Sequence, residues 1–401
     1  MKQNNYLLKV LVLIVILALV PFSASAGKKK DKKDEPVYRF KVDKEVKRTP
    51  VKNQYRTGTC WCFSTVSFLE SEILRKGKEE MDLSEMYIVR HTYPHKAVNY
   101  VRLHGKAVHE QGGQAHDVMD QIRRYGIVPD SVYPGMQIDE KRHNHGEMVS
   151  VLKGIVDGVL TRRGRRITPR WLEAYEAVLD VYLGKVPQSF TYKDKTYTPK
   201  SFAFDYLQIN PDDYVEFTSY THHPFYKKCR LELPDNWSYN SNYYNVPIDD
   251  LERIGDYALE NGYSLAWDGD VSERDFSFGR SQTAVGTGYA IVPEVDYEDM
   301  TRAERKKEIT EPVKEKEITQ ELRQKTFDNF TTTDDHLMHI VGLAHDQLGT
   351  KYYLTKNSGG VDSANDGYIY LSRAYYRLKG MAIMVHKDSI PPDIKDKIGL
   401  K

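Results

Sequence analysis

Cysteine is scarce in this 401-residue sequence, which contains only Cys60, Cys62 and Cys229. Three thiols cannot build the dense disulfide framework of a small secreted domain, and an odd number leaves at least one thiol free. Whether Cys62 and Cys229 pair stays open. A free thiol is exposed to oxidation, so its presence points either to a buried, inert side chain or to a chemical role.

An excess of charge of either sign is also missing, because 58 Lys and Arg residues balance 57 Asp and Glu residues. This balance predicts no attraction to nucleic acid. The sequence has neither the H-E-x-x-H motif nor the paired C-x-x-C motif of zinc sites. We therefore interpret His222, His223 and the histidines at positions 104–116 as solvent-facing, and we expect no metal and no cofactor.

Only one apolar run stands out, at residues 11–22, and it is shorter than the roughly 20 residues that a membrane-spanning helix needs. Lys2 and Lys9 precede it, and residues 23–26 supply an A-x-A cleavage site. We predict a signal peptide at residues 1–26 and a polar leader at 27–37. The protein is thus expected to be exported, periplasmic or secreted, without a stable membrane anchor, and residues 38–401 to form its folded part.

The folded part changes character along the chain. Helical spacing of apolar residues predicts helices in its first half, at residues 60–76, 116–125 and 171–183. Short apolar or aromatic segments predict strands in the last quarter, at residues 339–344, 352–356, 368–371 and 381–386. The charged stretch at about residues 294–327 is expected to be an exposed excursion or an insertion. Helices followed by strands indicate an α+β fold with two lobes.

Cys60 lies where the first predicted helix begins. A helix N-terminus carries partial positive charge and unpaired N–H groups, which favour a thiolate and can stabilise an oxyanion. Gln54, six residues earlier, could bring its side-chain amide to the same place. Cys62 is about 200° further around the helix and therefore points into the protein. On these grounds alone, an inert buried Cys60 is an equally good interpretation.

The residues around Cys60 resemble the active-site signature of the papain superfamily, which is formed here by Gln54, Cys60, Trp61 and residues 63–64. Thr57 stands where typical papain-like enzymes have a disulfide cysteine, and the aminopeptidase C/bleomycin hydrolase branch shares this difference. The resemblance implies a papain-like fold, in which the central helix of a helical lobe carries the Cys and a β-rich lobe carries His and Asn.

Further blocks resemble the papain-like fold, at residues 83–85, 111–114 and 125–134, and the block at residues 244–251 resembles the aminopeptidase C branch specifically. The resemblance implies that Gly112, Gly113 and Trp61 bind the substrate. It also implies a helical insertion at about residues 150–245 that serves assembly, so a homo-oligomer is one expected outcome.

The base is expected on the C-terminal strands. In a hairpin, His336 and Asn357 fall roughly opposite each other, whereas His339 faces the other side of its strand. A slip of one residue would reverse this assignment. The family pattern has Val-Gly five and six residues after the catalytic His, which selects His336. The pattern also has a Trp where this chain has Gly359, so the shield over the Asn–His hydrogen bond is expected to be missing or replaced by another aromatic side chain.

The resemblance implies a thiol peptidase that acts on peptide substrates through Cys60, His336 and Asn357, with a thioester intermediate and with Gln54 at the oxyanion. An aminopeptidase is expected, because in this branch the C-terminus lies in the cleft, and the tail at residues 388–401 is expected to restrict it. The alternatives are a papain-like endopeptidase, a catalytically weakened papain-like scaffold used for binding, and an exported metal- or ligand-binding protein whose thiol is incidental.

Overall fold

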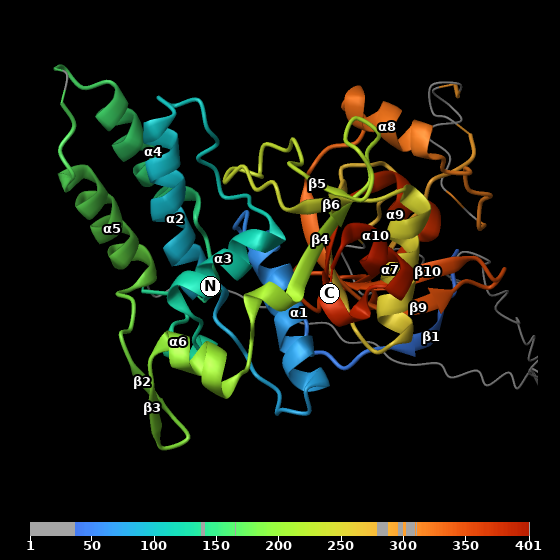
Figure 1. Ribbon diagram of the computed structural model, residues 1–401, viewed down its shortest axis with the longest axis horizontal. Coiled ribbons are helices and arrows are strands. Elements are labelled where there is room, and N and C mark those ends of the chain that lie inside the picture. The colour runs from blue at the N-terminus through green and yellow to red at the C-terminus, as the bar shows by residue number, and fades with distance from the viewer. Residues whose placement is uncertain are drawn as a thin grey trace, which may run out of the picture. The chain divides into compact units, whose positions relative to one another are not determined.

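The computed structural model describes residues 37–137, 141–164, 166–278, 288–295, 300–301, 309 and 311–400 (Figure 1). The predicted signal peptide and all but one residue of the predicted polar leader lie outside the described residues. In the ranges that are described, no helix is both long and apolar enough to cross a membrane.

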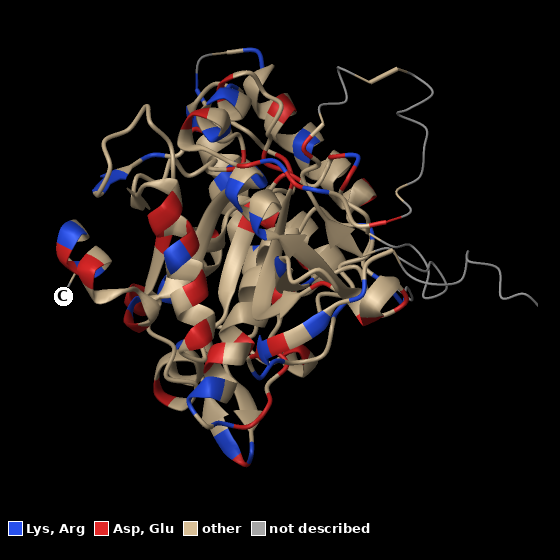
Figure 2. Ribbon diagram, turned by 90° about the vertical axis from the view of Figure 1, so that its right-hand side faces the viewer, with Lys and Arg blue, Asp and Glu red and all other residues tan. Residues whose placement is uncertain are grey.

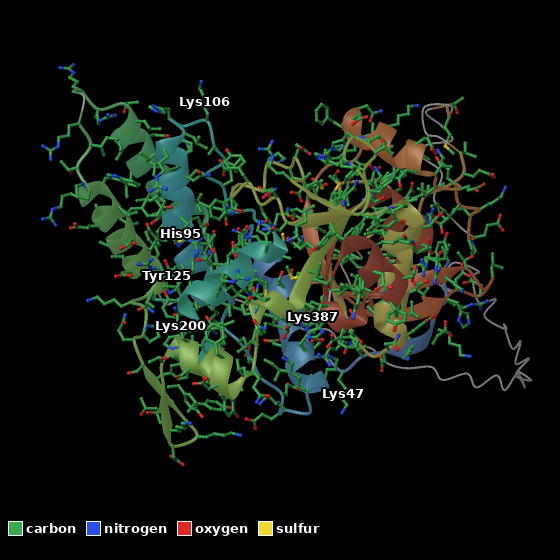
Figure 3. The ribbon with its side chains drawn as sticks, in the orientation of Figure 1. Lys47, His95, Lys106, Tyr125, Lys200 and Lys387 are labelled. Atoms are coloured by element: carbon green, nitrogen blue, oxygen red, sulfur yellow. The ribbon has the colours of Figure 1, made fainter. Side chains whose placement is uncertain are left out.

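Helices dominate the first half of the described chain. They are α1 (Cys60–Arg75), α2 (Glu85–Arg102), α3 (Ala115–Tyr125), α4 (Gly146–Leu160), α5 (Arg170–Leu183) and the short α6 (Pro199–Ser201). Between α5 and α6, β2 (Phe190–Tyr192) and β3 (Lys195–Tyr197) form a separate hairpin. Figure 1 shows α2, α4 and α5 packed side by side. His95 and Tyr125, labelled in Figure 3, join α2 to α3 through a 2.9 Å hydrogen bond.

A mixed sheet forms the second lobe. Its ten described strands are β1 (Lys41–Glu45), β4 (Tyr214–Thr218), β5 (Lys227–Cys229), β6 (Tyr243–Asn245), β7 (Leu265–Gly269), β8 (Tyr289–Ala290), β9 (His336–His345), β10 (Lys351–Lys356), β11 (Tyr368–Ser372) and β12 (Gly380–His386). Their order is β5-β6-β4-β12-β7-β9-β10-β11-β8, and β1 pairs with β9. The helices that accompany the sheet are α7 (Ile248–Glu260), α8 (Gln320–Asp328), α9 (Arg373–Lys379) and α10 (Pro392–Ile398).

The helix α1 joins the two lobes. It packs against β9 and β7 on one side and against α2 and α3 on the other, and it is buried over most of its length. Ala266, Leu337 and Met384 of the sheet belong to the same apolar cluster as its side chains. This enclosure fixes the first residue of α1 at the boundary between the lobes.

The predicted α+β class is confirmed, and the three predicted helices match α1, α3 and α5 to within one residue. The four predicted strands correspond to β9, β10, β11 and β12. The helices α2, α4 and α7 were not predicted. α2 buries every residue at positions 85–90 and contains Pro94, so its sequence lacks a clear amphipathic period.

The predicted helical insertion at about residues 150–245 is wrong in its second part. Residues 214–245 contribute β4, β5 and β6 to the main sheet. β4 is buried at all five positions, so it does not show the alternation that identifies a half-buried strand. The charged stretch at 294–327 is described only in part, and its last residues lie in α8.

Charge is distributed over the outer elements. Figure 2 shows Lys and Arg interspersed with Asp and Glu on helices and loops, whereas the strands in the centre are mostly uncharged. This pattern agrees with the balanced composition and with an apolar sheet that is covered by helices.

Candidate active site

Cys60 is the first residue of α1, and its side chain is partly exposed. The backbone N–H of Leu337 in β9 acts to lower the pKa of the thiol, against the larger effect of burial, so the thiol lies near the start of that strand. The thiol of Cys62 points inward and donates to Glu85 O at 3.3 Å. Cys62 and Cys229 are buried, and all three cysteines are free thiols, which answers the open question of their pairing.

His336 and Asn357 meet directly, with 2.8 Å between His336 Nε2 and Asn357 Oδ1. The backbone N–H of Ser358 also donates to Asn357 Oδ1, at 2.8 Å. Because a backbone N–H can only donate, the atom that it meets must be the oxygen of the amide. His336 Nε2 therefore carries the proton, and Nδ1 keeps its lone pair. This is the tautomer that a general base needs.

The contact forms across the β9–β10 hairpin, but not in the predicted register. After an irregularity in the ladder, Lys356 pairs with His339. If this pairing continues by one residue, Asn357 lies opposite Met338. His336 lies two positions from Met338 on the same face of β9, so its side chain reaches Asn357 diagonally. The two residues were expected to fall roughly opposite each other, and they are offset by two positions; the side chains still meet because diagonal neighbours lie within reach of each other.

His339 lies on the other face of β9, against α1. Its ring is fully buried, Nδ1 lies 2.9 Å from Ser67 Oγ, and the Phe68 ring packs edge-on at 6.1 Å. Burial, aided by the charge of nearby Lys356, keeps the pKa of His339 well below its ordinary value. An enclosed, neutral imidazole of this kind has a structural place in the fold.

Gln54 lies on a segment that is bound to the residues following Asn357. Its backbone N–H donates to Ser358 O at 2.9 Å, and Ser358 Oγ donates to Gln54 Oε1 at 2.5 Å. Gln54 Nε2 donates to Thr57 O at 2.7 Å, which leaves its second amide hydrogen for an oxyanion. Thr57, at the position of the missing disulfide cysteine, closes this turn by donating its hydroxyl to Gln54 O at 3.0 Å.

An aromatic side chain lies near the position of the missing Trp. Gly359 is exposed, and a Cβ built there would meet only the Asn357 amide, at 3.5 Å. The ring of Phe278 lies edge-on to that of His336, with 6.2 Å between centroids. Both residues line a hollow of about 480 Å³ together with Gln54 and Gly359. Phe278 thus covers part of the face that Gly359 leaves open.

The glycine segment rests on Trp61. The Trp61 side chain is only 2% exposed, its indole N–H donates to Gln111 O at 2.9 Å, and a Cβ on Gly113 would lie 3.0 Å from its ring. The prediction that Trp61 binds substrate directly is therefore wrong, because the buried ring supports the segment from behind. Gly112 is partly exposed, whereas Gly113 is buried.

Burial acts on the pKa values of both the thiol and the imidazole. Burial raises the pKa of the Cys60 thiol to about 12. Three carboxyl groups act in the same direction, those of Asp334, Asp268 and Asp235. Burial lowers the pKa of His336, against an opposing hydrogen bond.

Sequence reasoning missed those three carboxyl groups, which come from separate segments of the chain. Only Asp334 carried a signal, because it stands two residues before His336.

Two histidines and a glutamate lie together on the surface. We interpreted His222 and His223 as solvent-facing, and we did not consider Glu232. Among the described residues, His222, His223 and Glu232 form a group whose ligand atoms lie within 4.8 Å of one another. Both imidazoles contact the Glu232 carboxylate, at 3.2 and 3.1 Å, and all three side chains are at least partly exposed.

Comparisons with known proteins agree with this geometry. The papain family cysteine protease model matches residues 39–163, and the Peptidase C1-like family model matches residues 172–400, more than half of the chain. Aminopeptidase G of Lactobacillus delbrueckii subsp. lactis is 23% identical over 86% of this chain and 82% of its own. Bleomycin hydrolase of Mus musculus is 23% identical over 89% and 84%. The crystal structure of pepW from Lactobacillus rhamnosis has a TM-score of 0.67 at 19% identity, covering 90% of this chain and 84% of that one.

Fold and site together define a cysteine peptidase of the papain type. The chain belongs to the Peptidase C1-like family, in the branch of aminopeptidase C and bleomycin hydrolase.

Proposed function

We propose that this chain is an exported aminopeptidase that hydrolyses peptide bonds through Cys60, His336 and Asn357. The observation that carries the proposal is the 2.8 Å contact of His336 Nε2 with Asn357 Oδ1, on the strand β9 that packs against the helix of Cys60. The names of relatives, aminopeptidase G and aminopeptidase C among them, favour action at the amino end of a peptide. Export rests on the signal peptide predicted at residues 1–26.

Each residue of the active site has a separate role in the reaction. His336 Nδ1 accepts the proton of Cys60, and the sulfur attacks the carbonyl carbon of the scissile bond. The Cys60 N–H and the second amide hydrogen of Gln54 donate to the developing oxyanion. The imidazolium then protonates the leaving amine, and a thioester remains on Cys60. His336 deprotonates a water molecule that hydrolyses the thioester, and the proton returns to the sulfur. Asn357 holds the ring in one tautomer throughout.

A reporter assay tests this proposal. The full chain, kept reduced, is offered a leucine reporter with a free amino group and its N-acetylated counterpart. We expect rapid cleavage of the free-amine reporter, slow cleavage of the acetylated one, and no cleavage by Cys60→Ala. Equal cleavage of both would identify an endopeptidase. No cleavage by a protein whose Cys60 still reacts with iodoacetamide would identify a scaffold used for binding.

Export and assembly need separate measurements. Mass spectrometry of protein from the periplasm or the medium should find a chain that begins at Gly27. Light scattering tests the homo-oligomer, for which we expect a mass that is a multiple of the chain mass. A full-length cytoplasmic chain would contradict export, and a monomer would contradict assembly.

A further inference from the structure

A strap crosses from the sheet to the helical lobe. It consists of residues 230–242, between β5 and β6, and Figure 1 shows this yellow-green segment extending toward α3. The indole N–H of Trp237 donates to Asp117 Oδ2 in α3 at 2.9 Å, and Asn99 Nδ2 in α2 donates to Trp237 O at 2.7 Å. Ser238 Oγ lies 3.1 Å from His116 Nε2. The strap is thereby fixed to both lobes.

The strap places a carboxylate on the glycine segment. A Cβ built on Gly112 would lie 1.9 Å from Asp235 Oδ2, so the carboxyl group rests directly against the Gly112 backbone. Asp235 is partly exposed. The ammonium of Lys96 donates to the carbonyl oxygens of Glu110 and Gly112, and its charge acts to lower the pKa of Asp235 against the larger effect of burial.

Two more carboxyl groups complete the cluster. Asp334 is partly exposed and accepts a hydrogen bond from Gln114 Nε2 at 2.9 Å. Asp268 is 2% exposed, and neither of its carboxyl oxygens has a hydrogen-bond partner. The strongest electrostatic influence on Asp268 from another side chain comes from Asp334, and both act on the Cys60 thiol. In the described part of the chain, no salt bridge includes Asp235, Asp268 or Asp334.

Buried carboxyl groups without donors are rare in folded proteins, because their lost hydration is not replaced. Asp268 is such a group, and its place beside Asp334, Asp235 and the nucleophile therefore indicates a ligand that supplies both positive charge and N–H donors. An alkylammonium group meets both requirements.

We propose that Asp235, Asp334 and Asp268 bind the free α-ammonium group of the substrate's first residue. Asp334 and Asp235 contact the ammonium, and Asp268 stands behind Asp334 as a positioning residue. The inference rests on the proposed peptidase function and names the residues that would make it an aminopeptidase. It assigns this role to the strap and the cluster rather than to the C-terminal tail.

Distance favours the α-ammonium over a basic side chain. The α-nitrogen is separated from the scissile carbonyl carbon by two bonds, and that carbon must approach the sulfur to about 3–3.5 Å before attack. The α-ammonium thus lies within about 6 Å of the sulfur, and the three carboxyl groups act on the same thiol. A lysine side chain would carry its ammonium several bonds further away.

The tail occupies a different place. α10 is bound to α7 through Arg253 and Asp393, at 2.9 Å, and Ile394 and Ile398 are buried in the apolar cluster of the sheet lobe. Leu400 lines a hollow of about 350 Å³ that does not include Cys60, Asp235 or Asp334 among its lining residues.

A binding experiment tests the proposal without requiring catalysis. Cys60→Ala protein is titrated with L-leucinamide, with N-acetyl-leucinamide and with Nα-acetyl-lysinamide, and affinity is measured by calorimetry and by the shift in melting temperature. We expect leucinamide to bind at least about 30-fold more tightly than either acetylated ligand. Equal binding of leucinamide and N-acetyl-leucinamide would overturn the proposal. Equal binding of leucinamide and Nα-acetyl-lysinamide would overturn the choice of the α-ammonium.

Variants assign the effect to residues. In the Cys60→Ala background, Asp334→Asn and Asp235→Asn should each weaken leucinamide binding by about 30-fold, whereas Asp205→Asn, an exposed acid elsewhere, should not. Asp268→Asn should weaken binding while the melting temperature stays equal or rises, because an unpartnered buried carboxyl group is removed. Leucinamide binding that survives Asp334→Asn and Asp235→Asn, or that is lost on deleting residues 399–401, would refute the assignment. If leucinamide binds as expected but no reporter is cleaved by the unmodified chain, only the proposed catalytic function fails.

Discussion

The two histidines of β9 should respond in opposite ways to substitution. His336→Ala removes the base but little packing, because His336 is partly exposed and its recorded side-chain hydrogen bond is to Asn357. General-base catalysis contributes about 10²–10⁴-fold, so kcat/KM should fall by that factor. Loss of one hydrogen bond lowers the free energy of unfolding by about 1 kcal/mol, which changes the melting temperature by only about 2 °C.

His339→Ala should show the reverse pattern. The His339 ring is fully buried between Ser67 and Phe68, so its removal leaves a cavity in the interface of α1 and β9. Large-to-small changes at such positions lower the free energy of unfolding by about 3 kcal/mol. We therefore expect the melting temperature to fall by about 6 °C, and kcat/KM to stay near that of the unmodified protein below this temperature.

The assay compares kcat/KM on a free-amine reporter with thermal unfolding for each variant. His336→Gln is a matched control, because its amide can still donate to Asn357 but cannot act as a base, and it should be as inactive as His336→Ala. A folded but inactive His339→Ala together with a normally active His336→Ala would refute the assignment of the base.

Three further outcomes are expected. A thiol-directed epoxide should label Cys60 alone, as read by peptide mass spectrometry, because the other two thiols are buried; a label elsewhere with Cys60 unmodified would contradict the site. Phe278→Ala should lower kcat/KM several-fold by admitting water to the His336–Asn357 hydrogen bond. Adding Gly359→Trp to that variant should restore kcat/KM. Identical kinetics in the unmodified protein and both variants would mean that neither side chain shields the hydrogen bond. Burial raises the pKa of Glu315 from 4.5 to about 7, so the folded protein binds the carboxyl proton more tightly than the unfolded chain does. The free energy of unfolding should therefore fall by up to about 3 kcal/mol as the pH rises from 4.5 to 7. In urea unfolding, Glu315→Gln should flatten the dependence of the free energy of unfolding on pH between 4.5 and 7. An unaltered slope would show that Glu315 does not cause this dependence.

The parts that could be predicted from sequence have local signals. Cys60 opens a helix whose apolar spacing is regular, and the β9–β10 hairpin has apolar or aromatic strands on each side of a glycine turn. The contact of His336 with Asn357 could be expected from these strands together with the family pattern. The exact register could not, because the irregularity in the ladder arises from packing rather than from any turn signal.

The parts that escaped prediction depend on residues far apart in the chain. Phe278 and Gly359 are distant in sequence and meet only around His336. Asp235, Asp268 and Asp334 look like ordinary acidic residues until the strap, β7 and the segment before β9 bring them near the thiol. Trp61 was assigned to substrate on the family resemblance, whereas the rotation of one helical position from Cys60 turns its ring into the protein.

The strap also has a consequence for how the protein unfolds. The apolar cluster around α1 already contains side chains of both lobes, and residues 230–242 add hydrogen bonds from the sheet lobe to α2 and α3. Neither lobe can lose its structure without exposing apolar surface of the other, so the two lobes share one folding equilibrium. Calorimetry of the folded part should accordingly record a single heat-absorption peak, with equal calorimetric and van't Hoff enthalpies, in a chain long enough for two independent domains.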